Sequence, residues 1–162
     1  AAQAGTILAG LLARDGRDRQ GLAYVASPLG RARSTMDLVR EALGLAPGQY
    51  GLDDRLREIG YGEWEGSTLA EMQAKDPAFY ARRLTQKWTM SSPGGETYAA
   101  VQVRMRDWYD SLKGDTVAVA HGGTCRALMV ALGHETPQSA SDLFIEQGAV
   151  YVFGDGRLQK HG

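Results

Sequence analysis

The chain has 162 residues, a formal net charge of −1 at pH 7 and a hydrophobic content of 43%. That length is enough for one domain with its own core, and the near-neutral charge excludes the basic signature of a nucleic-acid-binding protein. No apolar stretch is long enough to span a bilayer, and the single cysteine excludes an internal disulfide framework and fits a reducing compartment. We therefore expect a cytoplasmic protein whose partners include neither nucleic acid nor a membrane.

The first third of the chain alternates helical and strand patterns. Residues 1–14 are predicted to form an amphipathic helix with its leucines on one face. Residues 22–26 form an apolar run typical of a buried strand. The turn after it begins a helix over residues 30–43, which Gly44 ends. The glycine-rich segment 53–66 is predicted to be a loop.

The middle of the chain carries clear signals for helix starts. Thr68 and Glu71 have the spacing of a capping box at the start of a short helix. Asp76 and Pro77 are a typical N-cap and first-turn pair for a second short helix. The segment 91–95, rich in serine, proline and glycine, is predicted to be a loop.

The last third predicts a long helix, a strand, another helix and a hairpin. The long helix covers residues 96–113, with apolar side chains spaced for one face. A strand over 116–120 precedes a helix that stops at Gly133, and residues 149–159 form a terminal hairpin. Alternating strands and helices predict an α/β fold, and we expect residues 1–162 to form a single domain.

The most informative segment follows the strand over residues 116–120. His121, Gly122 and Gly123 lie between that apolar strand and an apolar helical pattern. In α/β proteins, ligands bind beyond the carboxyl ends of strands, and a helix start offers unpaired N–H groups to an anion. An imidazole there suits phosphate chemistry, although a packed or solvated histidine is the alternative. Cys125 is predicted to be a small buried side chain in the first helical turn rather than a reactive thiol.

Arg31 occupies an equivalent place after the strand over residues 22–26. It lies in the first turn of the following helix, where its planar fork of donors could bind a phosphate. A solvated arginine is the alternative, and that is our expectation for Arg33. Two strand ends would then bring Arg31 and His121 to one site.

Three glutamates compete for a role as general acid. Glu58, Glu63 and Glu65 lie in one glycine-rich loop that also holds aromatic residues. A carboxylate held partly away from water there suits proton transfer, but solvated loop charge is the alternative for each. Glu96 is expected to start the long helix, where an acidic side chain is favoured by the helix dipole, rather than to contact a substrate.

The remaining polar residues give no sign of a metal site. His134 and His161 are expected at the surface, and no cluster of cysteine and histidine has metal-ligand spacing. Most charges in the segment 70–92, such as those of Arg82 and Arg83, are expected to form a solvated helical face. We therefore predict no metal and no cofactor.

Taken together, four motifs resemble the histidine phosphatase superfamily, in its phosphoglycerate mutase-like branch. They are Ser-Pro-Leu-Gly-Arg-Ala at 27–32 with Thr35, the segment 56–66 from Leu56 to Gly66, Pro-Gly-Gly-Glu-Thr at 93–97, and His-Gly-Gly at 121–123. The resemblance implies a three-layer α/β/α sandwich around a mainly parallel sheet and a metal-free phosphohistidine mechanism. It implies that Arg31, His121 and Gly122 bind the phosphoryl group, and that Glu58 protonates the leaving alcohol and later activates water.

The family's nucleophile motif, Arg-His-Gly after a first inner strand, has no match in these residues. We therefore expect that the 162 residues lack the domain's N-terminal strand and nucleophile loop, and that they are inactive alone. A stable domain should need that strand, because its absence would leave inner strands with unpaired backbone groups, which is costly. The leading hypothesis is a phosphomonoester hydrolase for a small phosphorylated metabolite. Alternatives are a phosphoglycerate mutase, disfavoured by the short segment after Glu58, and a non-catalytic phospho-ligand binding domain.

Overall fold

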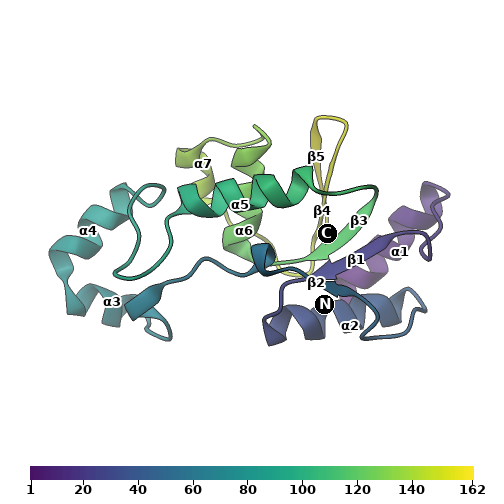
Figure 1. Ribbon diagram of the computed structural model, residues 1–162, viewed down its shortest axis with the longest axis horizontal. Helices are drawn as coiled ribbons and strands as arrows, with labels where there is room; N and C mark the ends of the chain where they lie inside the picture. The colour runs from purple at the N-terminus through teal and green to yellow at the C-terminus, as the bar shows by residue number, and fades with distance from the viewer.

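The structure is a computed structural model that describes residues 1–162, with helices on both faces of a small parallel sheet (Figure 1). The elements in chain order are α1 (Ala2–Arg14), β1 (Ala23–Ala26), α2 (Gly30–Ala42), β2 (Gly51–Leu52), the 3-10 helices η1 (Asp54–Leu56) and η2 (Gly62–Trp64), α3 (Leu69–Lys75), α4 (Pro77–Thr85), α5 (Tyr98–Asp110), β3 (Thr116–Val119), α6 (Gly122–Ala131), α7 (Pro137–Asp142), β4 (Val150–Gly154) and β5 (Arg157–His161).

The sheet has the strand order β2-β1-β3, and all three strands are parallel. Strands β4 and β5 pair with each other in a separate antiparallel hairpin. The predictions of an α/β fold with a parallel sheet and of a terminal hairpin are confirmed. Within the residues described, β3 is an edge strand, and Ala118 in its middle is exposed to solvent.

Side chains of β1 alternate between two cores, as the period of two in a strand requires. Tyr24 and Ala26 face a core formed with α2 and the apolar side of α1, which includes Met36. Val25 packs against the larger core on the other face, which α5 and α6 fill. The sheet is therefore the middle of three layers, and its strand ends lie between the two helical layers.

The capping signals in the sequence are realised in the structure. Thr68 and Glu71 form the predicted capping box, and Asp76 accepts the N–H of Phe79 at the start of α4. Gly44, with φ of +71°, follows the end of α2 as predicted. Such local signals succeed because the cap and the helix lie within a few residues of each other.

The expectation that Glu96 starts the long helix is wrong. Helix α5 begins at Tyr98, and Thr97 is its N-cap, with the hydroxyl accepting the N–H of Ala100. The carboxylate of Glu96 instead bonds to Arg104 and to the backbone of Gly60. The helix therefore begins two residues later than predicted, and the Glu96 carboxylate is turned toward the Gly60 loop.

Two short elements have no counterpart in the sequence predictions. Strand β2 contains only Gly51 and Leu52, and helix α7 contains six residues. Both are too short for a periodic apolar pattern to develop. The strand exists because the β1 edge offers hydrogen-bonding partners at Val25 and Ala26.

Helices α3 and α4 project to one side, away from the sheet (Figure 1). Trp64 connects them to the rest, because its ring packs edge-on against Phe79 with centroids 5.6 Å apart. Arg83 is buried and stacks over Tyr61 and Trp64, so the expectation of a solvated helical face is wrong for this arginine. No helix in the structure combines the length and apolarity needed to cross a membrane.

Candidate active site

The ends of β1 and β3 lie side by side and set the position of the site. Ala26 and Val119 are partners in the parallel register, and the N–H of Ser27 donates to the carbonyl of Val119 at 2.9 Å. The turns that follow the two strands therefore reach the same edge of the sheet. This brings Arg31 and His121, predicted separately as ligand-binding candidates, into direct contact.

Both ring nitrogens of His121 are engaged. Nε of Arg31 lies 3.2 Å from Nδ1, and Oγ of Ser27 lies 2.8 Å from Nε2. Because a guanidinium only donates, Nδ1 must be the acceptor and the ring proton must be on Nε2. The hydroxyl of Ser27 then accepts from Nε2–H, so this arrangement selects one tautomer of a neutral imidazole.

The environment of His121 favours this neutral form. Burial lowers the pKa of the imidazole below its ordinary value of 6.5. The Glu58 carboxylate opposes this, and the positive charge of Arg31 reinforces it. The backbone is fixed as well, because the N–H of His121 donates to Oγ1 of Thr124 at 3.0 Å, where the residue caps α6.

Glu58 reaches the N-terminus of α6 from its own loop. Its carboxylate accepts the N–H of Ile59 at 3.0 Å and the N–H of Gly123 at 3.3 Å. A Cβ on Gly123 would lie 2.3 Å from Oε1 of Glu58. The second glycine of the His-Gly-Gly motif is therefore needed for the carboxylate to approach the helix, whereas a Cβ on Gly122 would meet its nearest atom at 3.5 Å.

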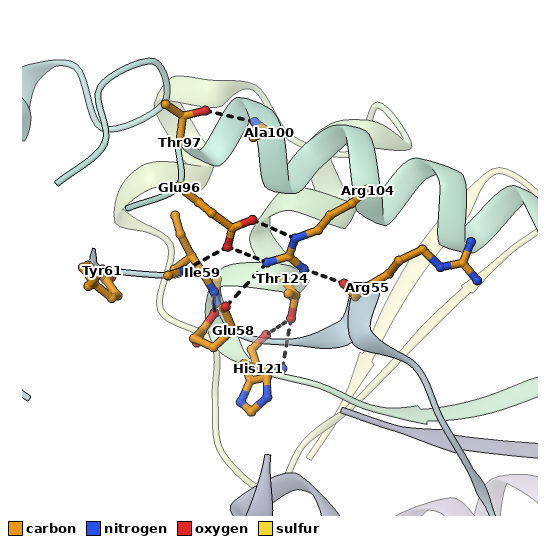
Figure 2. A network of polar contacts seen from close by, with 12 residues as sticks. Arg55, Glu58, Ile59, Tyr61, Glu96, Thr97, Ala100, Arg104, His121 and Thr124 are labelled. Carbon is orange, nitrogen blue, oxygen red and sulfur yellow. Dashed lines mark hydrogen bonds and ion pairs between the residues drawn. The ribbon is translucent and has the colours of Figure 1, made fainter. Parts of the chain in front are cut away.

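A cavity of about 640 Å³ opens beside these groups. It is lined by Leu29, Arg31, Asp54, Arg57, Glu58, Ile59, Gly60, Tyr61, Glu65, Glu96 and Arg104. Three arginines and four carboxylates thus line one cavity, and two of them, Arg104 and Glu96, are paired with each other. Figure 2 shows Glu58 and His121 in the lower part of the view, with Arg104 and Glu96 above them.

Several residues at the site were missed by the sequence predictions. Ser27 belongs to a recognised motif, but its contact with His121 depends on strand pairing. Arg57 and Arg104 line the cavity from η1's end and from α5. Arg57 precedes Glu58 directly and could have been found by that position, whereas Arg104 carries no local signal.

The competing candidates lie elsewhere. Arg33 is exposed on α2, and Glu63 is exposed on η2. Glu65 lines the cavity, but its carboxylate accepts the N–H of Tyr61 at 2.6 Å. Burial raises the pKa of the Cys125 thiol to about 12, which agrees with a packing role for this side chain.

The two other histidines do not join the site. His134 packs near the ring of Phe153, with centroids 6.0 Å apart. His161 lies in β5, and its Nε2 atom is buried without a hydrogen-bond partner. Both side chains are half-buried, so the predicted surface position holds only in part. The structure groups no three His, Cys, Asp or Glu side chains in a way that could hold a metal ion.

Comparison with known proteins identifies relatives across most of the chain. The profile of the histidine phosphatase superfamily (branch 1) matches residues 2–157. A bifunctional protein of Mycobacterium tuberculosis (strain ATCC 25618 / H37Rv) is 37% identical over 130 residues, which cover 80% of this chain and 31% of that protein. A 2,3-bisphosphoglycerate-dependent phosphoglycerate mutase of Gloeobacter violaceus is 33% identical over 131 residues, covering 74% of this chain and 58% of the mutase.

Comparison with solved structures also finds a phosphatase with a similar fold. A complex of mycobacterial glucosyl-3-phosphoglycerate phosphatase with inorganic phosphate has a TM-score of 0.67 at 29% identity, covering 88% of this chain and 72% of that one. The chain spans 31% and 58% of the lengths of the bifunctional protein and the mutase, less than two thirds of either.

Proposed function

The chain belongs to the histidine phosphatase superfamily, branch 1, and from that premise we propose that it forms the phosphate-binding and proton-transfer part of a phosphomonoester hydrolase. The observation that carries this proposal is the convergence of three segments. Arg31 contacts His121, and Glu58 bonds to the helix start that His121 caps. Cation, imidazole and carboxylate are then within reach of one small anion beside the cavity.

In this proposal, Arg31 binds the phosphoryl oxygens together with His121 and the N–H of Gly122. The charge-assisted fork of an arginine suits a phosphate, and a helix N-terminus adds positive potential. The Nε2–H of His121 can turn from Ser27 to a phosphoryl oxygen without any change of its charge. These groups stabilise the negative charge of the transferring group.

Glu58 is proposed as the general acid and then the general base. In the first step, the P–O bond to the alcohol breaks while a P–N bond forms to a nucleophilic imidazole, and Glu58 gives its proton to the leaving oxygen. In the second step, water attacks phosphorus and the P–N bond breaks. Glu58 takes the proton of that water, so the carboxyl returns to its first state.

We propose that the nucleophilic histidine lies outside these 162 residues. The ring of His121 is held by Arg31 and Ser27, and neither His134 nor His161 joins the site. The unpaired edge of β3 offers a further strand a place beside His121. The domain would then be a single unit completed by one strand and its following loop.

The test is hydrolysis of an aryl phosphate, with and without a metal chelator. A protein that carries the additional strand and its histidine should hydrolyse the ester at a rate that the chelator leaves unchanged. The 162-residue chain alone should bind phosphate without turnover. Loss of activity in chelator, restored by a divalent ion, would contradict the metal-free mechanism, and turnover by the 162 residues would contradict the external nucleophile.

A phosphoglycerate mutase activity is the second candidate. It is favoured by the match to the Gloeobacter violaceus mutase, and the same residues could return the phosphoryl group to a second hydroxyl instead of to water. Only 34 residues separate Glu58 from Pro93, which favours hydrolysis over the longer insertions expected of a mutase. Release of free phosphate from a phosphoglycerate, without isomerisation, would decide for the hydrolase.

A further inference from the structure

The motif Pro93-Gly94-Gly95-Glu96 has no part in the proposed chemistry, yet it lies in direct backbone contact with the Glu58 loop. The N–H of Glu96 donates to the carbonyl of Gly60 at 2.8 Å, and the N–H of Glu63 donates to the carbonyl of Pro93 at 2.9 Å. A Cβ on Gly95 would lie 2.6 Å from the carbonyl oxygen of Gly60. The glycine is therefore required for the two loops to pack backbone against backbone.

The side chain of Glu96 continues this contact. Its Oε2 accepts the N–H of Gly60 at 2.9 Å, so Glu96 and Gly60 are joined in both directions. The same carboxylate receives two parallel bonds from Arg104, Nε to Oε1 at 3.1 Å and Nη2 to Oε2 at 3.0 Å. This bidentate pairing fixes both side chains in one plane.

The guanidinium of Arg104 also contacts the loop on the N-terminal side of Glu58. Nη1 donates to the carbonyl of Arg55, and Nη2 lies 3.5 Å from the carbonyl of Glu58 itself. Figure 2 shows Arg104 reaching from α5 between Glu96 and the carbonyl of Arg55, with Glu58 below. The Glu96–Arg104 pair thus forms hydrogen bonds to the backbone before Glu58, at Glu58 and after it, at Gly60.

The pair of Glu96 and Arg104 is less exposed than the Arg106–Asp110 pair on the same helix. The side chain of Arg104 is only 19% exposed and that of Glu96 is 37% exposed. Burial by itself raises the pKa of Glu96, but the hydrogen bonds from Arg104 and Gly60 outweigh it and hold the pKa below its ordinary value. Glu96 therefore stays charged at neutral pH and keeps its partners.

We propose that Glu96 and Arg104 are positioning residues that hold the Glu58 carboxylate at the start of α6. This inference rests on the proposed role of Glu58 as general acid. The loop has no regular strand or α-helix around Glu58, so the partly buried ion pair takes the place of the backbone ladder that would otherwise fix it. A misplacement of about 1 Å in a reacting group can cost about a hundredfold in rate.

The experiment compares Arg104→Lys and Glu96→Gln with Arg106→Lys and Asp110→Asn in the active protein. Arg106 and Asp110 form an exposed pair on the same helix, with Nε and Oδ2 2.8 Å apart, so they are matched controls. Turnover is measured with an alkyl phosphate, which needs a proton on its leaving group, and with a nitrophenyl phosphate, which needs none.

Arg104→Lys and Glu96→Gln should each lower alkyl phosphate turnover by about ten- to a hundredfold and nitrophenyl ester cleavage by much less, with the inhibition constant of phosphate unchanged. In a Glu58→Gln background, neither change should lower alkyl phosphate turnover further. Equal losses for both esters, or further losses in that background, would overturn the positioning role. Both control variants should leave all values unchanged.

Hydrogen exchange of the segment 55–62 separates this inference from the proposed function. Arg104→Lys should speed exchange there while α6 stays protected. The loop loses the hydrogen bonds from Arg104 to its carbonyls whether or not Glu58 is the general acid. Unchanged exchange would overturn the inference even if Glu58 is the acid. Exchange could be faster while the Glu58→Gln variant shows no leaving-group preference. That result would reject Glu58 as the acid, although Glu96 and Arg104 would still be shown to hold the loop.

Discussion

The turn after β1 and the loop around Glu58 line one cavity, and the turn after β3 lies beside it through the contacts of His121 with Arg31 and of Gly123 with Glu58. The two turns and the loop are held in place by different means. Each turn continues a strand of the parallel sheet, so strand register fixes Arg31 and His121. The Glu58 loop has no strand, and the ion pair of Glu96 with Arg104 holds it by hydrogen bonds instead. The proposed anion binding thus depends on the sheet, and the proposed proton transfer depends on a few side-chain contacts, so substitutions should impair the two separately.

The largest effect is expected from Glu58→Gln in the active protein. The change should reduce turnover of an alkyl phosphate by about 10²–10⁴-fold, the usual contribution of a general acid. Phosphoryl transfer from a nitrophenyl ester should suffer much less, giving a burst of phenol before slow turnover. Stopped-flow and steady-state kinetics with both esters measure the difference.

The two neighbouring glutamates are the controls for that result. Glu63→Gln should be neutral, since this side chain is exposed. Glu65→Gln keeps an oxygen that can accept the N–H of Tyr61, so its effect should be small. A leaving-group-dependent loss in either variant, without one in Glu58→Gln, would assign the acid to a different residue.

Gly123→Ala tests the contact between the two regions. The added Cβ would lie 2.3 Å from Oε1 of Glu58 and should push the carboxylate away from α6, with a loss of up to about a hundredfold on alkyl phosphates. The Cβ would also lie 2.9 Å from Cγ2 of the buried Ile59, which offsets the gain of about 1 kcal/mol that alanine has over glycine in a helix, so the melting temperature should change little. Gly10→Ala, which meets no atom within 4 Å, should leave activity unchanged.

Arg31→Ala should weaken phosphate binding without a separate effect on proton transfer by Glu58. The affinity for phosphate or vanadate should fall by roughly ten- to a hundredfold, the range for losing one charge-assisted hydrogen bond. Arg33→Ala, two residues along α2 on an exposed side chain, should barely change it. Calorimetric titration compares the variants, and equal effects would remove Arg31 from the phosphate site.

The smallest effect concerns the pH dependence of stability. The pKa of His121 is lowered in the folded chain, so below pH 6.5 the unfolded chain binds this proton before the folded chain does. The free energy of unfolding should therefore fall as the pH drops below 6.5. His121→Asn should flatten that slope in denaturant titrations, and an identical slope in the variant would show that His121 titrates normally.

The sequence by itself determined the elements that depend on neighbours in the chain. The apolar run before His121, the glycines after it and the helical pattern beyond predict a strand, a turn and a helix, and the structure has all three. The caps at Thr68 and Asp76 were equally accessible. These features involve residues within one or two helical turns of each other, where sequence pattern and physical contact coincide.

Only the tertiary structure decided which of these elements meet. The bond between Ser27 and His121 joins residues 94 positions apart, and the grip of Arg104 on the carbonyl of Arg55 spans 49. The sequence placed Glu96 in a helix because local charge favours that position, yet its carboxylate accepts the N–H of Gly60, 36 positions away in the Glu58 loop. Contacts over such separations leave no periodic or spacing signal, because they arise from how the layers pack.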